Sequence, residues 1–165
     1  MFSSNPLARF NLTIQGLNHD LQVLAFTGQE AISTPYAFDV VLVSERPNID
    51  LESLLHKQAF LAYGDAGIHG QIHRVALGDA GKRLTRYNVT LVPRVAYLGH
   101  SINQRIFQQL SVPQIITQVL DAHGIHRDFH LFQLGSTYPA RDYCVQYDES
   151  DLHFIQRLCQ EEGIH

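Results

Sequence analysis

The sequence contains no tryptophan, and it has one methionine and two cysteines among 165 residues. So few cysteines exclude a small scaffold held together by disulfides and suit a chain that folds in a reducing compartment. A strongly basic face is missing too, because 12 Lys and Arg stand against 16 Asp and Glu for a net charge of −4. This balance argues against general nucleic-acid binding. Lys82, Arg83 and Arg86 lie near one turn and are typical of a solvated hairpin tip.

Long apolar runs are absent as well. No stretch approaches the ~18–20 apolar residues that a membrane-spanning helix requires. The first residues, MFSSNPLARF, have neither the basic start nor the long apolar middle of a secretory signal peptide. We therefore expect a soluble chain that is made in the cytosol without a signal peptide and has no stable membrane insertion.

Hydrophobic residues make up 45% of the sequence, enough for a packed core. Residues 7–14 and 84–95 alternate apolar and polar side chains with the period of a β-strand. Further strands are predicted at 21–27, 36–45, 59–63 and 68–77. The candidate core faces of the most regular strands are Ala8, Phe10, Leu12, Ile14, Tyr36, Phe38, Val40, Leu42, Tyr87, Val89 and Leu91.

The turns between these strands are short. The sequence predicts a helical turn near 48–57, a hairpin turn at 78–82, and the end of a strand at Pro93. Gly70 indicates a bulge or a close backbone approach. About six strands so connected are typical of a sandwich or a small barrel. Long strands with a glycine kink favour the barrel, so we predict an antiparallel barrel-like domain over residues 1–100.

After residue 100 the pattern becomes mixed. A short strand is predicted at 105–108 and a helix at 112–123, with Ser111 as its N-cap and Gly124 as its end. A further strand is predicted at 126–134. We predict that residues 101–165 are a mixed α/β segment, the first part of an adjoining domain. The fold class is therefore α+β, mainly β.

The last stretch passes from strand to helix. Tyr143, Val145 and Tyr147 alternate with Cys144 and Gln146 as in a strand. A helix follows, in which Ser150 caps, Asp151 places negative charge in the first turn, and Gly163 supplies the left-handed stop. Its predicted apolar stripe is Leu152, Ile155 and Cys159, flanked by Phe154 and Leu158. Both cysteines are expected to be buried and unbridged.

The sequence has ten histidines, which raise the question of a metal-dependent enzyme. His123, His126 and His130 straddle a helix end and a strand and so share no face. His69 and His73 share a strand face, but no acidic residue follows at ligand spacing. We predict no metal site and no cofactor.

Catalytic motifs are also missing. Neither G-x-S-x-G nor H-E-x-x-H occurs. Cys144 lies within a strand between apolar residues, where a thiol is usually inert. Glu161 and Glu162 lie at a helix C-terminus, where negative charge is unfavourable. They either meet a cation from another segment or are solvated, and both interpretations stay open. We predict that the chain is not an enzyme.

The literal sequence of the last stretch, RDYCVQYDESDLHFIQRLCQEEGI, closely resembles a signature of the valine–glycine repeat protein G (VgrG) family, the spike proteins of bacterial type VI secretion. Asp148 stands where the family more often has a small residue. The segments YNVTLVPRVAYL and RIFQQLSVPQIITQVLDAHGI resemble the family too, although Ala96 stands where an aromatic residue is usual. The candidate site, a structural family signature, is Arg141, Tyr143, Cys144, Val145, Gln146, Tyr147, Glu149, Ser150, Asp151, Phe154, Arg157, Leu158, Glu161, Glu162 and Gly163.

The resemblance implies a fold like that of a phage baseplate hub and an N-terminal hub fragment of a spike. It implies a homotrimer that joins a hexameric tube protein (Hcp) to a puncturing needle, contacts baseplate proteins, helps to deliver effectors, and leaves the bacterium through the type VI apparatus. One alternative is the hub of a contractile phage tail or tailocin. An alternative of another class is a small metal-dependent hydrolase that uses the histidines.

Overall fold

Two separate hydrophobic cores organise the described residues, and each belongs to one part of the sequence. The computed structural model describes residues 10–165. It divides the chain into two units, Met1–Pro93 and Arg94–His165. The 3-10 helix η2, Arg94–His100, contributes the buried Leu98 to the second core. The predicted domain boundary at residue 100 stays a prediction.

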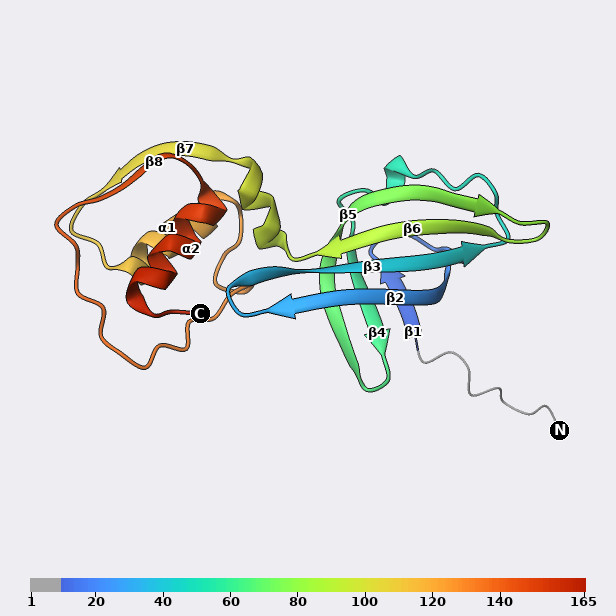
Figure 1. Cartoon of the computed structure of the whole chain (residues 1–165), viewed down its shortest axis with the longest axis horizontal. Helices are drawn as coiled ribbons and strands as arrows, with labels where there is room; N and C mark the ends of the chain where they lie inside the picture. The colour runs from blue at the N-terminus through green and yellow to red at the C-terminus, as the bar shows by residue number, and fades with distance from the viewer. Residues whose placement is uncertain (1–9) are drawn as a thin grey trace. The chain divides into compact units, whose positions relative to one another are not determined.

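Unit 1 is one antiparallel sheet of six strands that curls upon itself (Figure 1). Along the sheet the strands follow the order β1-β4-β5-β6-β3-β2. The rings of Phe10 and Phe26 bring the two end strands together, with their centroids 5.2 Å apart in an edge-to-face arrangement. The result is a half-barrel, which confirms the predicted mainly β, barrel-like fold. The strands are β1 (Phe10–Ile14), β2 (Gln22–Ala31), β3 (Thr34–Ser44), β4 (Gln58–Tyr63), β5 (Ala66–Ala80) and β6 (Thr85–Val92).

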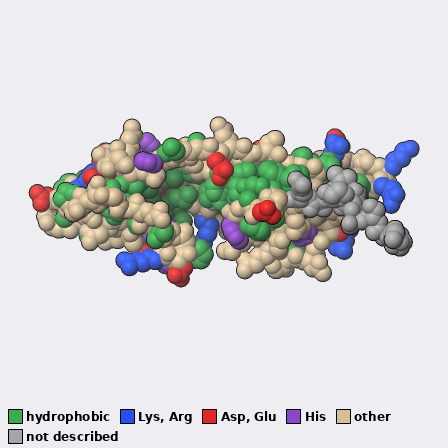
Figure 2. Space-filling view, turned by 90° about the horizontal axis from the view of Figure 1, so that it is seen from below, with side chains coloured by type: hydrophobic (Ala, Val, Ile, Leu, Met, Phe, Trp, Pro, Cys, Tyr) green, Lys and Arg blue, Asp and Glu red, His purple; other side chains and the backbone are tan. Residues whose placement is uncertain are grey.

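The alternation seen in the sequence places the predicted side chains in the core. Phe10 is an exception, because its side chain is 43% exposed. Tyr36 is only partly buried, and residues 7–9 of the predicted first strand lie outside the described residues. In Figure 2, apolar side chains reach the surface of unit 1. The buried residues that the alternation predicted are Leu12, Ile14, Phe38, Val40, Leu42, Tyr87, Val89 and Leu91.

Two glycines allow the strands to approach closely. A Cβ atom at Gly70 would lie 2.7 Å from Leu91 Cγ, and one at Gly28 would lie 2.1 Å from the ring of Phe38. Real Cβ atoms do not come so near, so both positions require glycine. The close approach predicted at Gly70 is confirmed.

Three predicted boundaries in unit 1 change. β5 continues through Gly78 to Ala80, and Gly81 N donates to Leu84 O (2.8 Å), so the hairpin turn lies at 81–84 and not at the predicted 78–82. β6 ends at Val92 because Pro93 follows, and residues 94–95 begin η2 instead. The helical turn predicted at 48–57 is the short 3-10 helix η1 (Glu52–Leu54).

Unit 2 has a two-stranded antiparallel sheet and two helices. The capping residue Ser111 donates its backbone N–H to Gln114 Oε1 (2.8 Å), which confirms the predicted helix start. Gly124, at φ 68°, follows the helix. None of the helices among residues 10–165 has the length and apolar character to cross a membrane. The elements are β7 (Ile102–Phe107), α1 (Val112–Ala122), β8 (Cys144–Ser150) and α2 (Asp151–Glu162).

The strand predicted at 126–134 is wrong. These residues form turns and irregular structure, and no strand of the described chain pairs with them. Phe129 and Leu131 are exposed, although the guanidinium of Arg94 lies 5.0 Å from the centre of the Phe129 ring. The segment has the alternation of a strand, but it pairs with none of the strands among residues 10–165, so its pattern does not become a strand.

Candidate functional site: the β8–α2 corner

β8 passes directly into α2 at the position that the sequence predicts. The N-cap Ser150 accepts a hydrogen bond at its Oγ from the backbone N–H of His153 (3.2 Å). The backbone N–H of Asp151 donates to Ser101 O (2.9 Å), which ties the corner to the residue before β7. Gly163 ends the helix in the left-handed conformation, at φ 68°. Both predicted helix boundaries are confirmed.

Asp151, the first residue of α2, is fully buried and lies at the centre of the corner. Asn103 Nδ2 donates to both carboxylate oxygens (3.1 and 3.0 Å), and the Arg105 guanidinium does the same with its two terminal nitrogens (3.1 and 3.2 Å). Gln146 Nε2 donates to Oδ1 (2.7 Å), and His123 Nε2 lies 2.5 Å from Oδ2. One carboxylate therefore connects β7, β8, α2 and the residue that ends α1.

The carboxyl of Asp151 favours its ionised form despite its burial. Burial alone raises the pKa of the carboxyl, but the hydrogen bonds from Gln146, His123 and Asn103, together with the charge of Arg105, hold that pKa below its ordinary value. The carboxylate also lies at the N-terminus of α2, where the helix dipole favours negative charge. Removing it would leave Arg105 without its partner inside unit 2.

A second ionic cluster binds the end of α2 to the segment before β8. Arg141 NH1 donates to Glu161 Oε2 (2.8 Å) and Arg141 NH2 to Glu162 Oε1 (2.5 Å). The hydrogen bonds to Glu162 and then to Glu161 raise the pKa of Arg141, and the bond from Arg141 lowers the pKa of Glu161. This settles the alternatives for the carboxylate pair in favour of a partner cation.

Arg157 joins the middle of α2 to β8. Its NH2 donates to Glu149 Oε1 (2.6 Å) and to Val145 O (3.2 Å), and its NH1 donates to Glu161 Oε1 (2.9 Å). The bond to Glu149 is the main cause that raises the pKa of Arg157. The shortest hydrogen bond of Arg157 is thus the one to Glu149 on the strand. The i,i+4 spacing along the helix predicts only the pairing with Glu161.

The apolar face of α2 is rotated from the predicted stripe. Phe154 and Leu158 are fully buried, whereas Leu152 and Cys159 are only partly buried. The Phe154 ring stacks on Phe107 of β7 with the ring centroids 5.6 Å apart. The predicted stripe is therefore confirmed at Ile155, which is buried, and wrong at Leu152 and Cys159. The buried side of the helix carries Asp151, Phe154, Ile155 and Leu158.

The two cysteines are free, as predicted. Cys144 is buried on the inner side of β8, and Cys159 is only partly buried, so the predicted burial holds for Cys144. Burial raises the pKa of the Cys159 thiol. A thiol with a raised pKa is mostly protonated at neutral pH and is a poor nucleophile.

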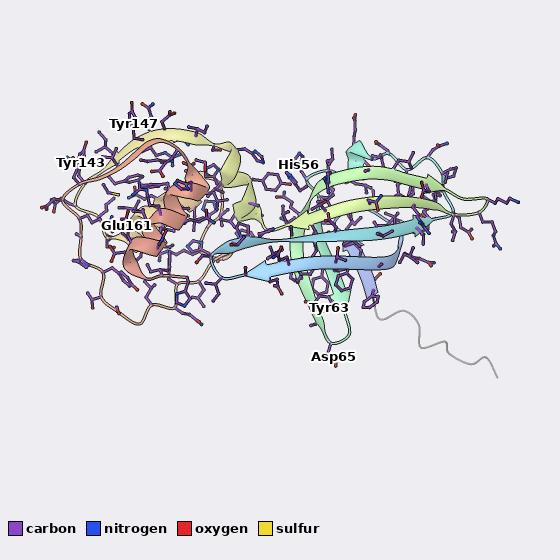
Figure 3. The ribbon with its side chains drawn as sticks, viewed as in Figure 1. His56, Tyr63, Asp65, Tyr143, Tyr147 and Glu161 are labelled. Carbon is purple, nitrogen blue, oxygen red and sulfur yellow. The ribbon has the colours of Figure 1, made fainter. Side chains whose placement is uncertain are left out.

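The remaining signature residues lie on the outer side of β8. Figure 3 shows Tyr143 and Tyr147 pointing away from the helices, and both are exposed. Val145, between them in the alternation, is partly buried. Asp148, which departs from the family pattern, adopts φ 51°, a conformation that glycine takes most easily and that aspartate tolerates better than most residues.

The histidines do not converge. His123 binds Asp151, His126 Nδ1 lies 3.1 Å from Asp121 Oδ1, and His130 Nδ1 lies 3.1 Å from His126 O. His69 stacks on Phe60 in unit 1, with the ring centroids 4.4 Å apart. Within residues 10–165, no three or more His, Cys, Asp or Glu side chains are grouped in a way that could hold a metal ion.

Sequence reasoning missed three partners of Asp151, namely Asn103, Arg105 and His123. All three residues lie far from Asp151 in the sequence. The negative charge of Asp151 in the first turn of the helix already explained that residue without any distant partner. The signal that could have found them is the alternation in β7, where Asn103 and Arg105 share a face with the apolar Phe107. A polar pair on the core side of a strand indicates a buried partner of opposite charge.

A curled antiparallel half-barrel followed by a small unit of two strands and two helices is a fold of phage tail hub proteins. The chain belongs to the phage tail baseplate hub (GPD) family, whose model matches residues 29–165.

The chain is similar in sequence to spike proteins of bacterial type VI secretion systems. The chain is 59% identical to the type VI secretion system spike protein VgrG4b and 58% identical to VgrG5, both of Pseudomonas aeruginosa. In both comparisons all of this chain is covered, but only 21% of the relative, so the chain spans about a fifth of their length.

A solved structure shares the fold. The E. coli c3393 protein, described as a component of the type VI secretion system with structural similarity to the T4 bacteriophage tail proteins gp27 and gp5, matches with a TM-score of 0.82 and 34% identity. The match covers 92% of this chain and 43% of that one.

Proposed function

We propose that this chain is the hub portion of a type VI secretion spike. The observation that carries the proposal is the match to the c3393 protein, in which fold and sequence agree over 92% of the chain. The identity of 59% to VgrG4b over the whole chain supports the same role. In this proposal the hub is a homotrimer that joins the hexameric tube protein (Hcp) to the needle, contacts the baseplate and helps to carry effectors outward.

The corner described above suits a mechanical role. A hub that transmits force needs a rigid fold, and a buried carboxylate of α2 with partners on β7, on β8 and at the end of α1 resists the separation of these elements. Arg141 ties the C-terminal end of α2 to the segment before β8, and Arg157 ties the middle of α2 to β8. The signature residues are therefore proposed to be structural rather than catalytic, and the chain is proposed to act without a cofactor.

One alternative has specific support. The matching family is named for phage tails, and the c3393 protein is described as similar to T4 tail proteins. A hub of a contractile phage tail or tailocin would use the same fold in another machine. The relatives with 59% and 58% identity carry the type VI name, which favours the secretion spike.

The proposal can be tested with a chimera in which this chain replaces the matched region of VgrG4b, produced in P. aeruginosa that lacks VgrG4b. We expect the chimera to be trimeric in sedimentation and to reach the culture medium, as judged by immunoblotting. The variant Asp151→Asn should be lost from the medium, and Asp148→Asn, an exposed acid of the same corner, should be exported like the unmodified chimera.

A folded, trimeric chimera that stays inside the cells would contradict the secretion role. The hydrolase alternative has its own test, which is metal analysis of the purified chain. Zinc retained in stoichiometric amount through dialysis, and lost in His69→Ala or His126→Ala, would replace the structural role by an enzymatic one.

A further inference from the structure

No further inference is drawn: the strongest candidate, the patch of exposed apolar side chains along the β7–β8 strand pair (Ile102, Ile106, Tyr143 and Tyr147), carries nothing because nothing in the structure of residues 10–165 shows what covers it.

Discussion

The replacement Asp151→Asn removes one charge from the buried corner and changes almost no volume. Asparagine would present an N–H group to nitrogens that now donate to a carboxylate, so it could not satisfy Asn103, Arg105, His123 and Gln146 together. The charge of Arg105 would then lack its partner. The variant therefore tests whether the carboxylate, rather than the shape of the side chain, holds the corner.

The magnitude follows from the burial of the partners. Breaking a buried ion pair by removing one member costs about 3–5 kcal/mol. The Arg105 side chain is 29% exposed, so water can solvate part of the orphaned charge. The loss of a negative charge from the first turn of α2 adds about 0.3–1 kcal/mol. We expect the free energy of opening of unit 2 to fall by about 2–4 kcal/mol.

Hydrogen exchange read by mass spectrometry is the suitable assay, because peptides from residues 144–163 report on unit 2 without a contribution from unit 1. A loss of 2–4 kcal/mol should accelerate their exchange by roughly 30- to 700-fold. The control Asp148→Asn should change the opening free energy by less than about 0.5 kcal/mol. If Asp151→Asn exchanges like the unmodified chain, the carboxylate does not hold the corner and the reasoning is refuted.

Four further predictions concern both units. Since the folded pKa of Asp151 is lowered, its contribution is complete above the unfolded pKa of about 4 and is lost as the pH falls through the folded pKa, so urea midpoints should show less acid dependence in Asp151→Asn. Phe154→Ala, at a fully buried ring, should cost about 3–5 kcal/mol in urea unfolding; a neutral result would contradict the packing of α2. Gly28→Ala, which drives a Cβ into the Phe38 ring, should cost about 1–3 kcal/mol or more, whereas Gly135→Ala, with open space around it, should be neutral within about 0.5 kcal/mol. Glu162→Ala should cost about 0.5–1 kcal/mol, since Arg141 keeps Glu161; equal melts would show that its pairing adds nothing.

Part of the fold follows from patterns that are local in the sequence. The alternation in β3 and β6 predicts which side chains enter the core because a strand turns successive residues to opposite faces. Helix ends are local as well, since Ser150 and Gly163 satisfy the groups at the ends of α2 without help from distant residues. These predictions are confirmed for that reason.

Other features depend on segments that are far apart in the chain. Residues 126–134 have the alternation of a strand, but a strand forms only where another edge accepts its backbone hydrogen bonds. The rotated face of α2 depends on β7, because Arg105 and Asn103 draw Asp151 inward. Neither outcome can be read from one short stretch of sequence.

By itself, the sequence determined the mainly β first part, the helix caps and the family signature from Arg141 to Gly163, because periodicity, capping chemistry and motif spacing are properties of neighbouring residues. Only the tertiary structure decided the open half-barrel, the partners of Asp151 and the cation that meets Glu161 and Glu162. It also decided which face of β7 and β8 is left apolar and exposed. The physical reason is that burial and charge pairing depend on which distant segments of the chain come into contact. The contribution of one residue to stability therefore depends on partners that lie far from it in the sequence.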